Sequence, residues 1–319
     1  MNTAALCASH SPLFHCYSQQ PKDWDKIQAA YKKSVDFVKD FDPELVIAFG
    51  SDHFNGFFLK MMPSFCIGLQ AEAADDIGGF PGKLDVPQET AVELIEYLRA
   101  HDIDPSVSYR MTIDHAFSQG IHDMLGGLDI IPVIPVFINC ITPPFVPFRR
   151  SRMLGEAIGR FAAQLGKRVL FLGSGGMSHH PTRYYPAIGT GEPQVAAWQV
   201  SGGDDPQSLT ASEWLERLDV MHHEGADMII RGERTAEDMR LNAEADQRFL
   251  DVLTRGALTE FDQWKPLDVV EEAGVGSMEL HTWIATTAAH MAAGGHSPEV
   301  DVYSVAPELG IAAGIVHAA

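Results

Sequence analysis

The stretch KRVLFLGSGGMSHHP, residues 167–181, joins an apolar run to a glycine-rich turn that ends in two histidines. Continuous apolar runs of this kind are typical of strands buried on both faces of a sheet. In open α/β sheets, ligands bind outside the carboxyl ends of the strands. The stretch therefore predicts a buried strand over 167–173 and a turn that brings His179 to the edge of the sheet.

Further strands and helices are predicted on both sides of this stretch. The other apolar runs are AALCA (4–8), ELVIAFG (44–50) and DIIPVIPVFIN (129–139). Amphipathic stretches with helical spacing cover residues 23–41, 87–101 and 152–166. Alternating strands and helices indicate an α/β protein with a central mixed sheet covered by helices.

The last third of the chain has a different pattern. Residues 212–256 and 279–295 have helical spacing, which predicts a helical C-terminal portion. The polar segment 182–210 carries glycine and proline and has few apolar positions, so we expect a surface loop or lid there. We find no internal repeat, and we expect residues 1–319 to form a single catalytic domain.

Composition limits the partners and the compartment. The 319 residues carry 23 basic and 43 acidic side chains, a formal net charge of -20. A field of this sign disfavours nucleic acid and anionic membrane surfaces as partners. The cysteines show no CxxC spacing, and no run approaches the ~20 apolar residues of a membrane span. Without the pattern of a secretory signal, these features predict a cytoplasmic protein.

Histidines follow the ends of three predicted strands. His10, His53 and His179 each stand on a turn rich in serine, glycine or aspartate, and His115 lies before the strand at 129–139. A single histidine at a strand end is usually a solvated or capping residue. Their coincidence at one edge of the sheet predicts a common site. The tandem His222 and His223 lie on a charged helical segment, where we expect them to face solvent.

Several neutral imidazoles in one place predict a divalent transition metal, and the number of carboxylates decides the chemistry. Three histidines suit a zinc hydrolase. Two histidines and one carboxylate are the arrangement of non-haem Fe(II) oxygenases. Ser174 lacks a GxSxG elbow, which argues against a serine hydrolase. The residues alone leave both metal sites open.

Several motifs together resemble the class III extradiol ring-cleaving dioxygenases. They are SHSP (9–12), FGSDHFNGFF (49–58), IDHAF (113–117), RMLGEAIGRF (152–161), KRVLFLGSGGMSHHP (167–181) and SMELHTW (277–283). The resemblance implies Fe(II)-dependent cleavage of a 3-substituted catechol beside its diol, with 3-(2,3-dihydroxyphenyl)propionate as the expected substrate. Both atoms of O2 would enter a 2-hydroxy-6-oxo-dienedioate product. The resemblance also implies a homo-oligomer.

The same resemblance assigns the metal ligands. The two histidines of the family fall on His10 and His53, and its glutamate falls on Glu279. Glu271 and Glu272 stand close to the short motif that carries this third assignment.

The resemblance places the acid/base histidines on His115 and His179, without ordering their roles of proton donor and acceptor. His180, directly after His179, departs from the single histidine of the family. Asp52 and Asp114 each precede an assigned histidine, so they are expected to orient imidazoles or to cap turns.

Two other functions stay open at this stage. One is a zinc-dependent hydrolase on the same scaffold, which metal analysis would distinguish. The other is a non-catalytic binding relative, which is disfavoured because all four site histidines are present. The side-chain carboxylate of the substrate needs a cationic or donor-rich pocket, and the candidate for it is RYY (183–185), which directly follows the catalytic turn.

Overall fold

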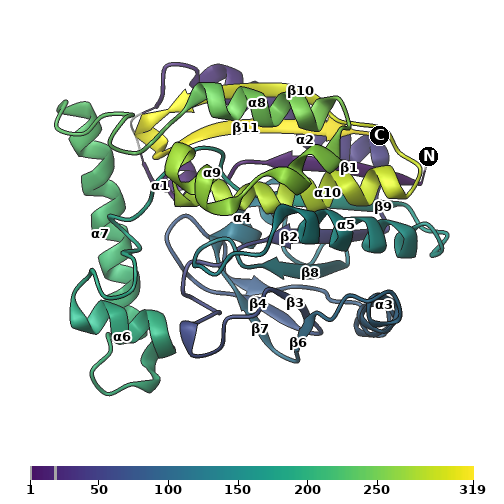
Figure 1. The fold of residues 1–319 in the computed structure, drawn as a ribbon, viewed down its shortest axis with the longest axis horizontal. Helices are drawn as coiled ribbons and strands as arrows, with labels where there is room; N and C mark the ends of the chain where they lie inside the picture. The colour runs from purple at the N-terminus through teal and green to yellow at the C-terminus, as the bar shows by residue number, and fades with distance from the viewer. Residues whose placement is uncertain (1, 18–19) are drawn as a thin grey trace.

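A computed structural model of the chain describes residues 2–17 and 20–319, and its centre is an eight-stranded sheet in the order β10-β11-β1-β9-β2-β8-β3-β6 (Figure 1). Its four central strands are parallel and buried throughout: β1 (Thr3–Ala8), β9 (Val169–Ser174), β2 (Leu45–Gly50) and β8 (Val133–Ile138). These strands lie within the predicted runs or exceed them by one residue. The prediction of a central mixed sheet in an α/β protein is confirmed.

The outer strands make the sheet mixed. The C-terminal hairpin of β10 (Glu299–Ala306) and β11 (Ile311–Ala318) joins antiparallel to β1. On the other side, β3 (Phe65–Gly68) runs antiparallel to β8, and β6 (Ser106–Ser108) follows it in parallel. A separate small sheet contains β4 (Ala71–Ala73), β5 (Gly82–Lys83) and β7 (Met111–Ile113). None of these strands was predicted.

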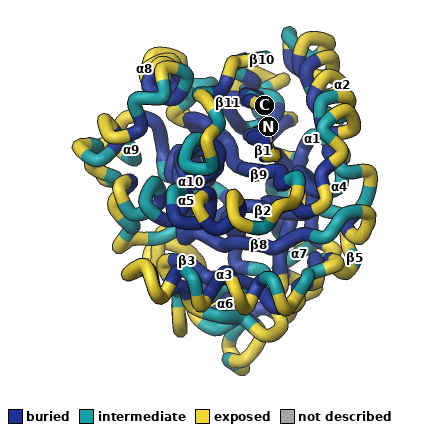
Figure 2. Tube along the Cα trace, turned by 90° about the vertical axis from the view of Figure 1, so that its right-hand side faces the viewer, coloured by how far each residue is buried: buried dark blue, intermediate teal, exposed yellow. Residues whose placement is uncertain are grey.

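Helices cover both faces of the main sheet, and Figure 2 shows the buried strands between them. On one face lie α2 (Trp24–Phe41) and α4 (His115–Leu125); on the other lie α3 (Gln88–Ala100), α5 (Phe148–Ala162) and α10 (Leu280–Ala292). Alternate residues of β9 point to opposite faces, because side chains alternate along a strand: Leu172 packs with the first group and Phe171 with the second.

The C-terminal portion before the hairpin is helical, as predicted. It contains α7 (Ala211–Ile230), α8 (Ala243–Thr254) and α9 (Pro266–Ala273). No helix in the described part of the chain is long and apolar enough to cross a membrane.

Residues 182–230, which we call the side arm, stand to one side of the sheet (Figure 1). The segment 182–210, expected to be a loop or lid, contains the helix α6 (Pro193–Ser201). Trp198 of α6 is buried and stacks on Trp214 of α7, with 5.6 Å between ring centroids. The segment is therefore not a loop alone, because its apolar residues build a small core with α7.

Candidate metal and catalytic site

The structure brings the predicted site residues together at the carboxyl edge of the sheet. His10, His53 and His179 follow β1, β2 and β9, and His115 is the first residue of α4. All four line one pocket, and each is at most 7% exposed. Glu279, at the end of a 3₁₀ turn before α10, reaches the same place from the far end of the chain.

The carboxylate of Glu279 is the point on which three imidazoles converge. Its Oε1 lies 3.2 Å from His10 Nε2 and 3.6 Å from His53 Nε2, and its Oε2 lies 4.0 Å from His179 Nε2. Glu271 and Glu272, the neighbouring alternatives, are exposed on α9.

Glu279 is held as an anion. Ser51 Oγ and the backbone N–H of Gly176 donate hydrogen bonds to its two oxygens, each at 2.6 Å. Burial alone raises the pKa of this carboxyl, but the adjacent imidazoles of His10 and His53 outweigh burial and hold the pKa below its usual range. The site therefore presents a negative charge beside two imidazole nitrogens.

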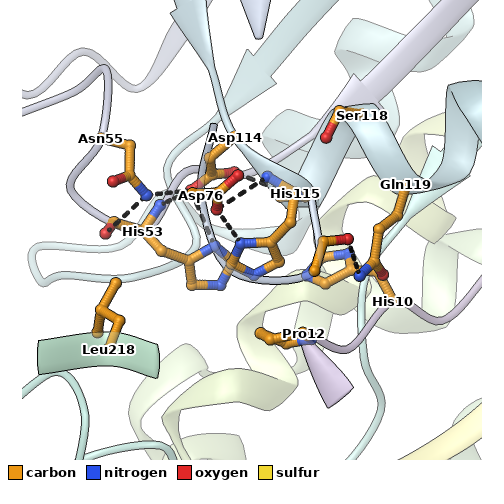
Figure 3. A network of polar contacts seen from close by, with 12 residues as sticks. His10, Pro12, His53, Asn55, Asp76, Asp114, His115, Ser118, Gln119 and Leu218 are labelled. Carbon is orange, nitrogen blue, oxygen red and sulfur yellow. Dashed lines mark hydrogen bonds and ion pairs between the residues drawn. The ribbon is translucent and has the colours of Figure 1, made fainter. Parts of the chain in front are cut away.

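The two predicted ligand histidines are fixed through their Nδ1 atoms. His10 Nδ1 forms a 3.0 Å hydrogen bond with Ser174 Oγ. His53 Nδ1 donates to Asp114 at 3.2 Å, and Asn55 donates to the same oxygen at 3.1 Å (Figure 3). An imidazole anchored at Nδ1 presents the Nε2 lone pair to a metal, which is how outer carboxylates orient metal ligands.

The two predicted acid/base histidines are anchored in the same way but by different partners. His179 Nδ1 donates to the carbonyl of Met177 at 2.8 Å. His115 Nδ1 donates to Asp76 Oδ2 at 2.5 Å, and Figure 3 marks this contact with a dashed line. Burial lowers the pKa of His179, so this imidazole is neutral at pH 7 and its Nε2 accepts a proton. His115 stacks on His53 with 4.4 Å between ring centroids.

The other predicted residues have distinct positions. Asp114 caps α4 through Ala116 N and also contacts His53, so it both caps and orients. Asp52 accepts only backbone N–H groups of the turn that follows His53, so it is a turn cap. His180 does not line the pocket and accepts a hydrogen bond from Val275 N.

His222 corrects one prediction. We expected it to face solvent, but it is only 5% exposed, stacks on Tyr184 at 3.9 Å and lines the pocket. Its position four residues after Leu218 and eight after Trp214, both buried, places it on the inner face of α7. That spacing was readable in the sequence. His223, the next residue, is partly exposed.

The sequence did not predict two further residues of the site individually. Tyr185 lines the pocket, and Asp76 does not line it but accepts a hydrogen bond from His115. Asp76 lies in a segment with no predicted strand or helix, 39 residues before His115. Tyr185 was named only within RYY (183–185), and its ring lies 5.2 Å from that of His53. Nothing in the local sequence distinguishes Asp76 from Asp75, because its role depends on a tertiary contact.

The donor atoms fit a divalent transition metal. Two imidazoles with free Nε2 atoms and one buried carboxylate within 3.6 Å form a recognised donor set for such ions. His10, His53 and His115 also have ligand atoms within 4.8 Å of one another. We favour the set that contains Glu279, because its negative charge partly balances a divalent cation and its oxygen approaches both imidazoles.

Known proteins with similar sequences include relatives that are named as 1,2-dioxygenases. A relative from Pseudomonas putida, named 2,3-dihydroxyphenylpropionate/2,3-dihydroxicinnamic acid 1,2-dioxygenase 2, is 37% identical over 97% of this chain and 96% of its own length. A relative from Mycolicibacterium gilvum, named 2,3-dihydroxyphenylpropionate/2,3-dihydroxicinnamic acid 1,2-dioxygenase, is 40% identical over 96% of this chain and 94% of its own length.

Structural and family comparisons agree with the fold. An uncharacterized protein of Escherichia coli K12 has a similar crystal structure, with a TM-score of 0.50 and 13% identity over 98% of both chains, which supports the fold alone. Residues 4–310 match the family described as the catalytic LigB subunit of aromatic ring-opening dioxygenase. The chain belongs to this family.

Proposed function

We propose that this chain is an Fe(II)-dependent extradiol dioxygenase that opens the ring of 3-(2,3-dihydroxyphenyl)propionate. The observation that carries the proposal is the convergence of His10 and His53 on Glu279, with His115 and His179 beside them in one buried pocket. The names of the two relatives described above support the choice of substrate.

His10, His53 and Glu279 would hold the metal. Fe(II) in such a site supplies adjacent positions for a catechol and for dioxygen, together with the redox chemistry between them. Ser174, Asp114 and the residues that donate to Glu279 keep these three ligands in place. The family resemblance and the carboxylate in the donor set favour iron over zinc.

His115 and His179 would move the protons. Each is fixed at Nδ1 and has Nε2 free, so each can exchange a proton with a group bound in the pocket. One imidazole accepts a catechol proton as the substrate binds, and a protonated imidazole returns one when the ring opens. Their burial excludes water from these transfers.

The overall reaction balances without another reagent. The ring bond beside the diol breaks, and both atoms of O2 enter the product, a linear 2-hydroxy-6-oxo-dienedioate that is yellow. The substrate supplies the electrons that reduce dioxygen, so no external reductant is consumed.

The test is anaerobic reconstitution with Fe(II), followed by 3-(2,3-dihydroxyphenyl)propionate and air. We expect O2 uptake and a yellow product in equal amounts, lost in His53→Ala but kept in His223→Ala, which changes a histidine outside the pocket. Absence of uptake by protein that holds stoichiometric iron would refute the proposal. Hydrolytic activity that requires zinc would instead support the zinc enzyme.

A further inference from the structure

One wall of the pocket contains none of the proposed metal ligands or acid/base histidines, and it is formed by Tyr184, Tyr185 and His222 of the side arm. The free Nε2 atoms of His10, His53 and His179 approach Glu279, so the diol of a bound catechol lies on that side. The ring substituent must then point away from these imidazoles. The remaining lining includes Tyr185 and other residues of the side arm.

The hydroxyl of Tyr185 is a buried polar group without a hydrogen-bond partner among the described residues. The residue is 7% exposed. Burial, reinforced by Asp114, raises the pKa of this phenol well above its usual value, so it remains a neutral donor. A buried donor without a partner is unfavourable, and a ligand that accepts from it removes that cost.

The hydroxyl of the neighbouring tyrosine, Tyr184, is paired. The hydroxyl of Tyr184 accepts a hydrogen bond from Arg234 at 2.9 Å, and its ring stacks on His222. Burial lowers the pKa of His222 to about 3, so this imidazole adds no positive charge to the wall.

Arg217 supplies the positive charge near this wall. Its Nη1 donates to the carbonyl of Tyr184 at 2.7 Å, and its guanidinium lies 5.4 Å from the Trp214 ring centroid. In the described part of the chain it forms no ion pair, although acidic residues outnumber basic ones by 43 to 23. Its positive charge lowers the pKa of the Tyr185 phenol, although burial has the larger and opposite effect.

We propose that Tyr185 and Arg217 form the subsite for the side-chain carboxylate of the substrate. Tyr185 donates a hydrogen bond to one carboxylate oxygen, and Arg217 provides the compensating positive charge behind it. This assignment rests on the proposed function, because it requires the catechol diol to lie at the histidines. It makes Tyr185 and Arg217 determinants of specificity, with no part in proton transfer.

The experiment compares 3-(2,3-dihydroxyphenyl)propionate with 3-propylcatechol, which has a tail of similar length and no charge. We expect Tyr185→Phe and Arg217→Met each to lower kcat/KM for the acid by about 10- to 150-fold, the range for a hydrogen bond to a charged group. Cleavage of 3-propylcatechol should change little, which also reports that the variants are folded. Tyr184→Phe, the matched control, should leave the ratio of the two substrates unchanged.

Equal losses on both substrates in Tyr185→Phe, or no loss on either, would overturn the assignment. If the variants do not fold, inhibition of the wild-type enzyme tests the same subsite. We expect 3-phenylpropionate to inhibit the cleavage of 3-propylcatechol competitively and more strongly than 3-phenyl-1-propanol does. Equal inhibition by the two compounds would overturn the subsite. Cleavage of both catechols without preference would refute the subsite alone, whereas cleavage of neither would refute the proposed function with it.

Discussion

Asp76→Asn is expected to slow turnover without weakening substrate binding. The Oδ2 atom of Asp76 accepts hydrogen bonds from Nδ1 of His115 at 2.5 Å and from its backbone N–H at 3.2 Å. Asp76 does not line the pocket, so it reaches the substrate only through His115. Asparagine keeps the shape and an accepting oxygen but replaces the carboxylate that accepts the hydrogen bond of His115 Nδ1 with a neutral amide.

The magnitude follows from the bond that changes. A hydrogen bond to a charged group contributes about 1.5–3 kcal/mol, and each 1.36 kcal/mol corresponds to about a tenfold change in rate. Asp76→Asn should therefore lower kcat by about 10- to 150-fold. KM should stay near the wild-type value, because no contact with the substrate is lost.

The assay is steady-state O2 uptake by the iron-loaded variant, with iron content and a thermal melt measured on the same sample. Asp123→Asn, which removes a carboxylate paired with His15 outside the pocket, is the control. Gly79→Ala tests the same contact differently, since an added Cβ would lie 2.2 Å from Asp76 Oδ1 and must displace it. A folded, iron-loaded Asp76→Asn enzyme with unchanged kcat, or with a raised KM instead, would refute this reasoning.

Four other perturbations test separate parts of the structure. Gly276→Ala should abolish activity, because its Cβ would lie 2.1 Å from His179 Nε2; oxygen uptake by the folded variant checks this. Glu279→Gln should weaken iron retention by more than the about 10- to 100-fold typical of an outer-shell change, measured as metal content after dialysis. Trp214→Ala should destabilise the protein by about 3–5 kcal/mol in urea unfolding, since the indole is fully buried. The pKa of His222 is lowered by burial to about 3, below its unfolded value, so its contribution is complete above about pH 6.5 and lost as pH falls. Lowering the pH from about 6.5 to 5 should therefore lower the free energy of unfolding of the apoprotein by about 2 kcal/mol, because His222 is protonated only in the unfolded state. His222→Gln should remove this part of the pH dependence, which urea unfolding at the two pH values would measure.

The central strands could be predicted because their signal is local. The strands β1, β2 and β9 are buried throughout and mostly apolar, since both faces of each strand are covered by helices. The hairpin of β10 and β11 was missed because β10 is the edge strand, with exposed residues such as Val300, and β11 is rich in alanine and glycine. The strands of the small sheet have only two or three residues each, too few to show a period.

The site residues likewise differ in whether the local sequence indicates them. His10, His53 and His179 were found because each follows a recognisable strand, and Glu279 through the family resemblance. Asp76 could not be found, because its function exists only where the chain returns to meet His115. Residues that act through a tertiary contact carry no pattern of their own in one sequence.

The side arm and the sheet contribute different properties to the same pocket. The proposed ligands His10 and His53 stand on turns after strands that are buried in the two large apolar clusters covering the sheet. Tyr185 and Trp214 belong to a separate cluster, which the side arm forms together with Phe54 and Ile77. Trp214 donates to Asn55 at 3.2 Å, and Asn55 donates to Asp114, the carboxylate that orients His53.

These hydrogen bonds connect Trp214 of the side arm to His53, one of the proposed metal ligands. They fix the position of the arm relative to His53, but they place no side chain of the arm on Glu279 or on the free Nε2 atoms. The substituent wall can therefore vary in shape and charge while the ligand set stays fixed by the sheet. We therefore expect substitutions of Tyr185 and Arg217, which lie in the side arm, to affect the selectivity for catechols more than turnover.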